Sequence, residues 1–424
     1  MTPTVYTQLG DIAKLIRGVT FKPQELVPVG SPRSAVCFRT ANIQAELDQS
    51  DLISVPRKVI KRSEQRLRTG DLLVSSANSW NLVGKCVAVP DLPYDATAGG
   101  FISILRPQTD RVDPRYLYLW LNSSGVQHRV RQCARQTTSI ANLSVERFLE
   151  LTLLLPPIPE QRRIAVTLEK ADAIRRNREC SLALVDTLAR SVFFEMFGNA
   201  VKEARARDLP LGWRVACLES IAAGAANSCA GGPFGSSLGR SDYAAAGVPV
   251  IRGNNLIAGR GEFRDEGFVF VSPAKADELR RNIALPGDVI FTQRGTLGQV
   301  AQIPFSAKYD RYIISQSQMK VTPDTDVIDP TYLVHYFLSP RAQSELAHRT
   351  VATGVPHINL SILKNFTVVL PPLPLQRRFA AFVAQQATAR RSMKRAYREA
   401  ERLAKSLAHS VFEREVGDRA INTQ

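Results

Sequence analysis

The apolar positions of the chain follow two different rhythms, which alternate along its 424 residues. In the first rhythm, short apolar runs such as 71–77 and 289–293 are separated by Gly, Pro and Asn, which is typical of short strands and loops. In the second, apolar residues recur three and four positions apart over long stretches, which is the pattern of an amphipathic helix. We therefore expect a β-rich globular domain followed by a long helix, and then the same arrangement again.

The two long helical patterns each carry a narrow apolar seam. At about 1.5 Å of rise per residue, each helix should be about 50 Å long. A helix with so narrow a seam is not stable alone in water, so we expect the two to pair as an antiparallel coiled coil. The seam positions are Ile164, Leu168, Ala171, Leu182, Val185, Ala189, Val192 and Met196 in the first helix, and Phe379, Val383, Met393, Tyr397, Ala400, Ala404, Leu407 and Val411 in the second.

A repeat relates the two halves of the chain. Residues 154–165 (LLPPIPEQRRIA) return as residues 369–380 (VLPPLPLQRRFA), displaced by 215 positions. Three short motifs upstream, Gly-Asp, Asp-Pro and Asn-Leu-Ser, also occur in both halves at similar displacements. A whole unit is therefore duplicated. The predicted fold is α+β and pseudo-twofold, with domains at residues 1–155 and 200–370 and helices at residues 156–199 and 371–417.

The two copies differ at two places in the second part of the unit. Leu375 stands where the first copy has Glu160, so the Pro-x-x-Glu-Gln form is incomplete there. Arg175 matches Arg390 at a displacement of 215, whereas Ser191 matches Ser410 at 219. We therefore expect four additional residues in the second helix, which in a coiled coil form a stutter.

Charge narrows the class of partner. The chain has 55 Lys and Arg against 39 Asp and Glu, a formal charge of +16 and a pI near 9.8. Such a balance favours a polyanion, nucleic acid before a membrane surface, although a generally solvated basic surface has the same composition. No signal peptide or apolar run long enough for a membrane span is visible, so we expect a cytoplasmic protein that does not enter a membrane.

The sequence lacks the motifs of several kinds of catalytic and metal-binding site. The six cysteines form no C-x-x-C pair and the five histidines no H-E-x-x-H, so we expect no metal and no cofactor. No lysine follows Asp or Glu by two positions, which removes half of the common metal-dependent nuclease pattern. The loop at 231–239 is Gly-rich but lacks the Gly-Lys-Ser/Thr ending of a phosphate-binding loop.

Candidate DNA contacts fall in one basic stretch and in loops at matched positions of the two copies. Basic side chains suit phosphates, and Asn, Gln and Arg suit base edges, although charged surfaces and ordinary turns use the same residues. The first copy supplies Arg57, Lys58, Lys61, Arg62, Ser76, Asn78, Ser79, Trp80, Thr137 and Thr138. The second copy supplies Ser236, Ser237, Arg252, Asn254, Gln293, Arg294, Thr296 and His357.

Taken together, these motifs resemble the specificity subunit of type I restriction-modification systems along essentially the full chain. The motifs are LPPIPEQ at 155–161 with its long helix, its repeat at 370–376, GPFGS at 232–236, and the Gly-Asp strands at 70–73 and 287–290. The resemblance implies two target-recognition domains, each reading one half of a bipartite, asymmetric DNA site. It also implies that the chain is not an enzyme.

The same resemblance implies the partners. They would be double-stranded DNA, two copies of the methyltransferase (modification) subunit, and the ATP-dependent restriction subunit, a translocase and nuclease. The helices would bind the modification subunits and set the spacer between the half-sites, through Gln161, Arg162, Ile164, Leu168, Gln376, Arg377, Phe379 and Val383. The alternatives are a coiled-coil adaptor without sequence-specific DNA binding, and a free-standing restriction enzyme.

Overall fold

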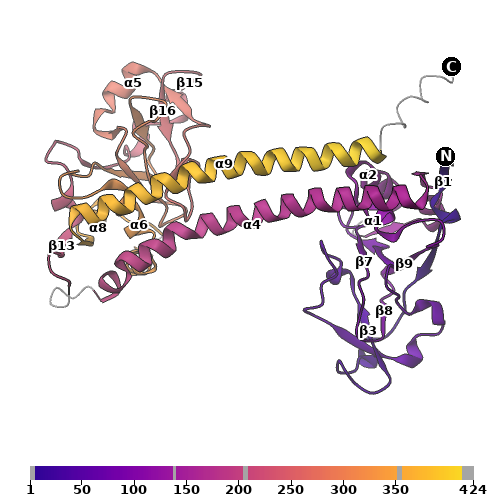
Figure 1. Cartoon of the computed structure of the whole chain (residues 1–424). Coiled ribbons are helices and arrows are strands. Elements are labelled where there is room, and N and C mark those ends of the chain that lie inside the picture. The colour runs from indigo at the N-terminus through magenta and orange to yellow at the C-terminus, as the bar shows by residue number, and fades with distance from the viewer. Residues whose placement is uncertain (1–4, 137–139, 204–208, 351–355, 413–424) are drawn as a thin grey trace, which may run out of the picture. The chain divides into compact units, whose positions relative to one another are not determined.

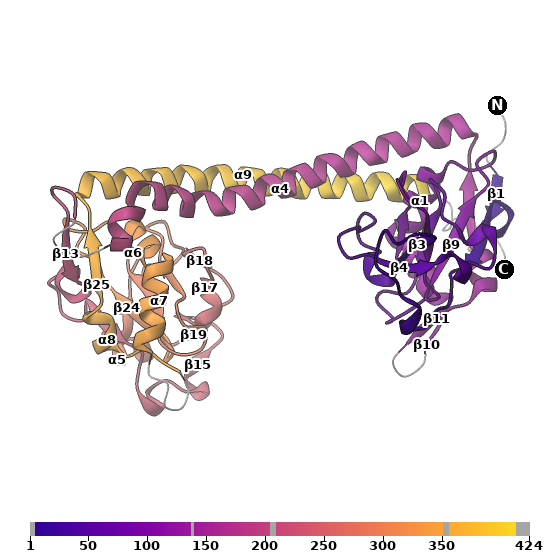
Figure 2. The ribbon, with the colours of Figure 1, turned by 90° about the horizontal axis from the view of Figure 1, so that it is seen from below.

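The computed structural model describes residues 5–136, 140–203, 209–350 and 356–412. These residues belong to two compact units. The first unit comprises residues 1–179 and 395–424, and the second comprises residues 180–394. Each unit therefore combines one β-rich domain with a segment of each long helix, whose elements are labelled in Figures 1 and 2. The two helices are α4 (Ile158–Glu203) and α9 (Leu373–Phe412).

The β-rich domain of the first unit contains four small sheets. Its strands, in sheet order, are β1 (Val5–Gln8) and β12 (Thr152–Leu155); β2 (Ala13–Arg17), β9 (Ile102–Pro107), β5 (Leu72–Ser75) and β7 (Cys86–Ala88); β4 (Ile53–Pro56), β3 (Ser34–Phe38) and β8 (Ala96–Ala98); and β10 (Ala134–Gln136), β11 (Ala141–Leu143) and β6 (Ala77–Asn78). Its short helices are α1 (Pro114–Asn122), α2 (Ser124–Gln132) and α3 (Val145–Leu149).

The β-rich domain of the second unit repeats this plan with additions. Its strands, in sheet order, are β13 (Arg214–Cys217) and β25 (Thr367–Leu370); β14 (Cys229–Gly231), β24 (Gln318–Val321), β21 (Val289–Thr292) and β22 (Val300–Gln302); β15 (Tyr243–Ala244), β19 (Val269–Val271), β16 (Val248–Ile251), β23 (Tyr312–Ile314) and β20 (Ile283–Ala284); and β17 (Leu256–Ile257) and β18 (Glu262–Phe263). Its short helices are α5 (Pro273–Glu278), α6 (Pro330–Phe337), α7 (Pro340–Arg349) and α8 (Leu360–Lys364).

The duplication is visible in the strand pairing. The sheet β2-β9-β5-β7 corresponds to β14-β24-β21-β22, and all of its pairs are antiparallel. The parallel pair of β3 with β8 corresponds to that of β16 with β23. In each copy the first strand of the unit also pairs antiparallel with the strand that leads into the Leu-Pro-Pro turn.

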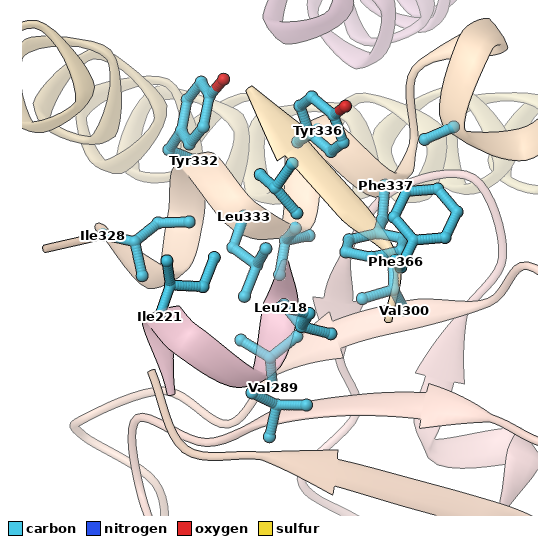
Figure 3. Packing of buried hydrophobic residues seen from close by; sticks show 14 of the residues in the cluster. Leu218, Ile221, Val289, Val300, Ile328, Tyr332, Leu333, Tyr336, Phe337 and Phe366 are labelled. Carbon is cyan, nitrogen blue, oxygen red and sulfur yellow. The ribbon is translucent and has the colours of Figure 1, made fainter. Parts of the chain in front are cut away.

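The core of each domain lies between the antiparallel sheet and its short helices. In the second unit, Val289 and Val300 of the sheet pack against Leu333 and Phe337 of α6 (Figure 3). Phe337 also stacks on Phe366, with the ring centroids 4.7 Å apart. In each copy an Asp caps the helix that covers the sheet, and Pro occupies the first turn.

Within each unit the two long helices run antiparallel. In the second unit, the Phe193 ring of α4 lies 5.4 Å from the Phe379 ring of α9, and Gln386 Nε2 donates to the carbonyl oxygen of Val185 at 2.5 Å. In the first unit, Arg178 of α4 donates to the carbonyl oxygen of Ala396 of α9. The prediction of an α+β fold with β-rich domains and antiparallel long helices is confirmed. Met393, predicted in the apolar seam, is exposed instead.

Each domain packs against both long helices. In the first unit, Leu168 near the start of α4 and Phe412 at the end of α9 join one apolar cluster. Phe412 lies edge-on to Tyr116 of α1, with the ring centroids 5.5 Å apart. In the second unit, Phe193 makes the corresponding contact with Tyr332 of α6 at 5.7 Å. Each Ser-Val-Phe repeat thus packs against the domain of the other copy.

Candidate nucleic-acid interface

A buried ion pair supports the central strand of each domain. Asp71, just before β5, accepts two hydrogen bonds from Arg106 at 2.6 and 2.8 Å. At the matched position, Asp288 accepts from the ammonium group of Lys320 at 3.1 Å and from the Thr322 hydroxyl at 2.6 Å. The four charged side chains are largely or fully buried. The repeated Gly-Asp motif is therefore structural, and it fixes the strand whose far end carries the candidate DNA-reading turn.

In the first domain that turn follows β5 and is held by the neighbouring turn between β8 and β9. The backbone nitrogens of Ser76 and Ala77 donate to the carbonyl oxygen of Phe101 at 2.9 and 3.2 Å. The Ser76 hydroxyl donates to Ser103 at 2.6 Å, and the Asn78 amide donates to Ser75 at 3.1 Å. The polar groups of Ser76 and Asn78 are thus partly used inside the domain.

The remaining predicted residues of this turn are more accessible. Ser79 is exposed, and the Trp80 side chain is 38% exposed. Strand β6 pairs with β11, so the turn lies beside the β10–β11 hairpin. The predicted contacts Thr137 and Thr138 lie outside the described residues.

The matched turn of the second domain lies next to His357. The Gln293 backbone nitrogen donates to the carbonyl oxygen of Ser317 at 2.7 Å. Arg294 and His357 form an antiparallel β-bridge. Arg294 and Thr296 are exposed, whereas Gln293 and His357 are partly buried. These residues therefore share one edge of the domain.

The Gly-rich loop joins the same edge. The amide of Gln316 donates to the carbonyl oxygens of Gly235 and Leu238 at 2.5 and 3.2 Å. Gln316 precedes Ser317, which holds Gln293, so the loop and the turn share one support. Ser236 and Ser237 are exposed within this loop. We call residues 232–238, 293–296, 315–318 and 357 the recognition edge of the second domain.

Arg252 and Asn254 lie beside this edge, after β16. The backbone nitrogen of Ser315 donates to the carbonyl oxygen of Ile251 at 3.0 Å, which connects the two segments. Asn254 is exposed, whereas the neighbouring Asn255 is buried and braces the loop through carbonyl oxygens of Arg264 and Glu266. Arg252 has a buried Nε for which the described residues provide no hydrogen-bond partner.

The first domain has an equivalent arginine that sequence reasoning missed. Arg39 precedes Asn42 as Arg252 precedes Asn255, and in both cases the Asn side chain accepts from the arginine backbone nitrogen. The Nε of Arg39 is likewise buried and has no hydrogen-bond partner within the described part of the chain. The matching spacing of Arg and Asn in residues 39–42 and 252–255 was the available signal.

The basic stretch of the first domain follows β4. Arg57 binds Asp95 at 2.9 Å and Arg62 binds Glu64 at 3.3 Å, so part of their charge is offset. Lys58 and Lys61 are exposed, and the described residues provide neither with an ion-pair partner. The stretch packs through Val59 onto a small core with Val19 and Phe21.

Most helix residues predicted to bind partners are used inside the units. Gln161 has no exposed surface. It accepts from the Asp113 backbone nitrogen at 2.8 Å and donates to the carbonyl oxygens of Pro156 and Arg111 at 2.7 and 3.1 Å. Gln376 is buried in the same way against Asp329. The prediction that these two glutamines bind a partner is therefore wrong, because their side chains reach no surface.

Two apolar members of that set are also internal. Leu168 and Phe379 are buried, so their predicted contact with a partner is wrong for the same reason as that of the glutamines. Ile164 and Val383 pack against the domain cores but are only partly buried, and their contact with a partner stays a prediction. Only Arg162 and Arg377 are exposed.

Other apolar side chains on the helices are exposed instead. They are Val166, Ile174, Leu184, Leu188 and Phe194 on α4, and Met393 and Leu403 on α9. In the second unit, Phe194 also lines a cavity of about 930 Å³ between α4, α9, α6 and the β17–β18 hairpin.

The two copies also differ in the first turn of their long helices, where Glu160 of α4 corresponds to Leu375 of α9. Glu160 is partly exposed and binds Arg163 through two hydrogen bonds of 2.7 and 2.8 Å, which lower the pKa of its carboxyl group. Leu375 packs against the core of the second unit. The substitution exchanges a surface ion pair for apolar contact and leaves both helix starts intact.

The described part of the chain contains no cluster of three or more His, Cys, Asp or Glu side chains that could hold a metal ion. None of its helices combines the length and the apolar character needed to cross a lipid bilayer.

The chain is similar to curated specificity subunits of type I restriction enzymes. It is 26% identical to the type I restriction enzyme EcoKI specificity subunit of Escherichia coli strain K12, over 97% of this chain and 89% of that protein. It is 21% identical to the putative type I restriction enzyme MjaX specificity subunit of Methanocaldococcus jannaschii, over 75% of this chain and 72% of that protein.

Solved structures share the fold. The type I restriction-modification S subunit from M. genitalium matches with a TM-score of 0.57 at 14% identity, over 97% of this chain and 96% of that chain. A chain from a structural study of the assembly of the type I restriction-modification system matches with a TM-score of 0.60 at 17% identity, over 97% of this chain and 98% of that chain. The family model for the type I restriction modification DNA specificity domain matches residues 3–181 and 253–399. The chain therefore belongs to the family of type I restriction-modification DNA specificity domains.

Proposed function

We propose that the chain is the DNA-recognition subunit of a type I restriction-modification complex. Each β-rich domain, 1–155 and 200–370, acts as a target-recognition domain and reads one half of a bipartite, asymmetric site. The chain performs no catalysis itself. Adenine methylation, and ATP-dependent translocation and cleavage, belong to a modification subunit and a restriction subunit, with which it acts in the cytoplasm.

One observation supports this proposal above all. The two domains repeat the same framework, yet the side chains at the ends of their matched strands differ. Asp71 and Asp288 anchor equivalent strands, which are followed by Ser76 in one domain and by Gln293 in the other. A shared scaffold with different hydroxyl, amide and guanidinium groups suits the reading of two different base sequences.

The long helices support the role of partner binding and spacing. Helix α4 is continuous through residues of both units, and so is α9. Exposed apolar side chains such as Leu184 and Leu188, four positions apart, share one face of α4. Such a face is suited to bury apolar area against a partner. We assign it to the modification subunits, two copies of which would bind one chain.

Methylome sequencing tests the proposal. The chain, co-expressed with its modification subunit, should direct methylation to one bipartite sequence. Arg294→Ala should then change the base preference in one half only, because Arg294 lies on the recognition edge of a single domain. Arg311→Ala, which removes an exposed ion pair with Asp277, is the matched control. Methylation of no defined sequence would contradict the proposed function.

The spacing role has its own experiment. Four residues are removed from α4 between Glu179 and Val185, together with four from α9 between Arg391 and Tyr397, so that the helices shorten together. A loss of about 6 Å corresponds to about two base pairs, and the gap between half-sites should shrink while both half-sites stay the same. An unchanged gap would show that the helices do not set the spacer.

A further inference from the structure

Each domain displays a largely exposed phenylalanine ring beside its candidate reading turn. Phe101 is 64% exposed in the first domain, and Phe234 is 86% exposed in the second. A phenylalanine ring facing water contributes little to folding, and an isolated exposed ring needs no explanation by itself. These two rings, however, both lie beside a candidate reading turn, and this shared position requires an explanation.

Hydrogen bonds show that the two rings come from neighbouring, equivalent turns. The carbonyl oxygen of Phe101 accepts from the backbone of Ser76, and the carbonyl oxygen of Ser317 accepts from Gln293 in the same way. Phe101 is thus the structural equivalent of Ser317. Each of these residues precedes the strand that pairs with the central strand of its domain.

A second turn lies against each of these turns, at Gly18 in the first domain and at Gly232 in the second, and these two turns are also equivalent. Gly18 donates to the carbonyl oxygen of Ile102, and Gly232 donates to that of Gln318. A Cβ at Gly18 would collide with the carbonyl oxygen of Gly99, and one at Gly232 with that of Ser315. Both glycines therefore allow the same close approach of two turns. By this register Phe234 is the equivalent of Thr20.

The ring and the hydroxyl group have exchanged turns between the domains. The first domain has Thr20 on one turn and Phe101 on the other. The second has Phe234 on the first turn and Ser317 on the second. One phenyl ring and one hydroxyl group thus occupy the same pair of touching turns in both domains, although their order differs.

The turns that carry the rings are held firmly by the fold. In the second domain, Gln316 binds two carbonyl oxygens of the Phe234 loop, and the Ser237 backbone nitrogen donates to the Phe234 carbonyl oxygen at 3.1 Å. In the first domain, Gly100 lies against the Thr20 hydroxyl group. Each ring is therefore displayed in a defined place beside polar groups suited to base edges.

Thymine has the only methyl group on the edges of the four bases in the major groove, and apolar side chains contact it there. We infer that Phe101 and Phe234 are specificity-determining residues, each packing against a thymine methyl group in the half-site read by its domain. This inference rests on the proposed function, because it assumes that the reading turns of both domains contact DNA bases. The adjacent hydroxyl and amide groups then read the polar atoms of neighbouring bases.

The test uses the full chain in complex with its modification subunit and begins with selection from random DNA duplexes. Each thymine of the selected site is then replaced singly by deoxyuridine, which lacks the methyl group. In each half, one replacement should weaken binding by about fourfold, the value expected for burying one methyl group. Phe101→Ala should abolish that sensitivity in one half, and Phe234→Ala in the other half only.

Phe305→Ala is the matched control. Phe305 is also a largely exposed phenylalanine of the second domain, but it lies against Gly287, at the opposite end of the central strand from Gln293. This variant should keep both sensitivities. Because all three rings are exposed, the variants should fold, which thermal unfolding checks.

The outcomes separate this inference from the proposed function. If the wild-type complex selects a bipartite site but the Phe101 and Phe234 variants keep their sensitivity to deoxyuridine, the inference is overturned and the proposed function stands. An equal loss of affinity for every sequence also overturns it, because the rings would then not discriminate bases. Selection of no sequence by the wild-type complex overturns both.

Discussion

The side-chain oxygen of Gln161 accepts a hydrogen bond from the backbone nitrogen of Asp113, 48 positions earlier, at a distance of 2.8 Å. Asp113 in turn caps α1, which covers the sheet of the first domain. The same link joins Gln376 to Asp329 in the second unit at 2.9 Å. The first turn of each long helix is therefore fixed to its domain by one buried amide, and the helix cannot pivot there without losing it.

The link predicts a large stability difference between adjacent substitutions. Gln161→Ala leaves two carbonyl oxygens and one backbone nitrogen buried without partners, and should lower the free energy of unfolding of the first unit by about 2–4 kcal/mol. Arg162→Ala, at the next and exposed position, removes only a long ion pair with Asp113 at 3.6 Å and should lower it by less than about 1 kcal/mol. Urea unfolding followed by hydrogen exchange in residues 113–121 measures both. Equal effects would show that the amide link is not needed.

A second prediction concerns the buried ion pair of the second domain. Lys320→Met leaves the Asp288 carboxylate buried without its cation and should cost about 3–5 kcal/mol of unfolding free energy. Adding Asp288→Asn should recover part of this loss, since no buried charge then remains. Lys308→Met, at an exposed lysine of the same domain, is the control. The prediction fails if the Lys320 and Lys308 variants are equally stable.

The pH dependence of stability should report His335. Desolvation, together with the charge of Arg190, lowers the pKa of this ring to about 4 from its ordinary value of 6.5. The folded state therefore keeps the ring neutral, while the unfolded chain gains a proton as the pH falls below about 6.5. The contribution of the neutral His335 ring to the free energy of unfolding is therefore complete above pH 6.5 and is lost as the pH falls towards 4.

At pH 5 the free energy of unfolding of the wild type should be lower by about 2 kcal/mol because of His335. His335→Phe, which keeps a ring against Phe193 and Phe379, should not show that part of the loss. Urea unfolding of both proteins at pH 7.5 and pH 5 gives the difference. Parallel changes in the two proteins would contradict the prediction.

The basic stretch of the first domain predicts a change in salt dependence. If Lys58 and Lys61 contact phosphates, the variant Lys58→Gln/Lys61→Gln should reduce the slope of log affinity against log salt by about 0.9 per contact. The base preference should stay the same, because phosphate contacts carry no sequence information. Lys405→Gln, which removes an exposed lysine paired with Glu401 on α9, is the control. DNA titrations at several salt concentrations measure the slopes, and an unchanged slope would exclude the phosphate contacts.

Local features of this protein could be predicted from the sequence because their causes lie within a few residues. Asp113 and Asp329 cap helices through backbone nitrogens two and three positions ahead, and the Pro-Pro turns place the starts of α4 and α9. The duplication, the β-rich domains and the antiparallel long helices followed from repeats and periodicity. The matched turns at Ser76 and Gln293 were located in the same way.

Burial and neighbours across long sequence distances were decided by the tertiary structure. Gln161 is a polar residue in a first helical turn, and nothing near it in the sequence shows that the Asp113 backbone covers it. Phe412 contacts Tyr116 across almost 300 positions, a pairing that periodicity in either helix alone does not predict. The exchange of Phe101 and Phe234 between turns became visible only through the strand register. The sequence by itself determined the elements and their repetition, because hydrogen-bond capping and apolar periodicity act locally. Only the tertiary structure decided which side chains remain at the surface, because burial depends on segments that the chain brings together from far apart.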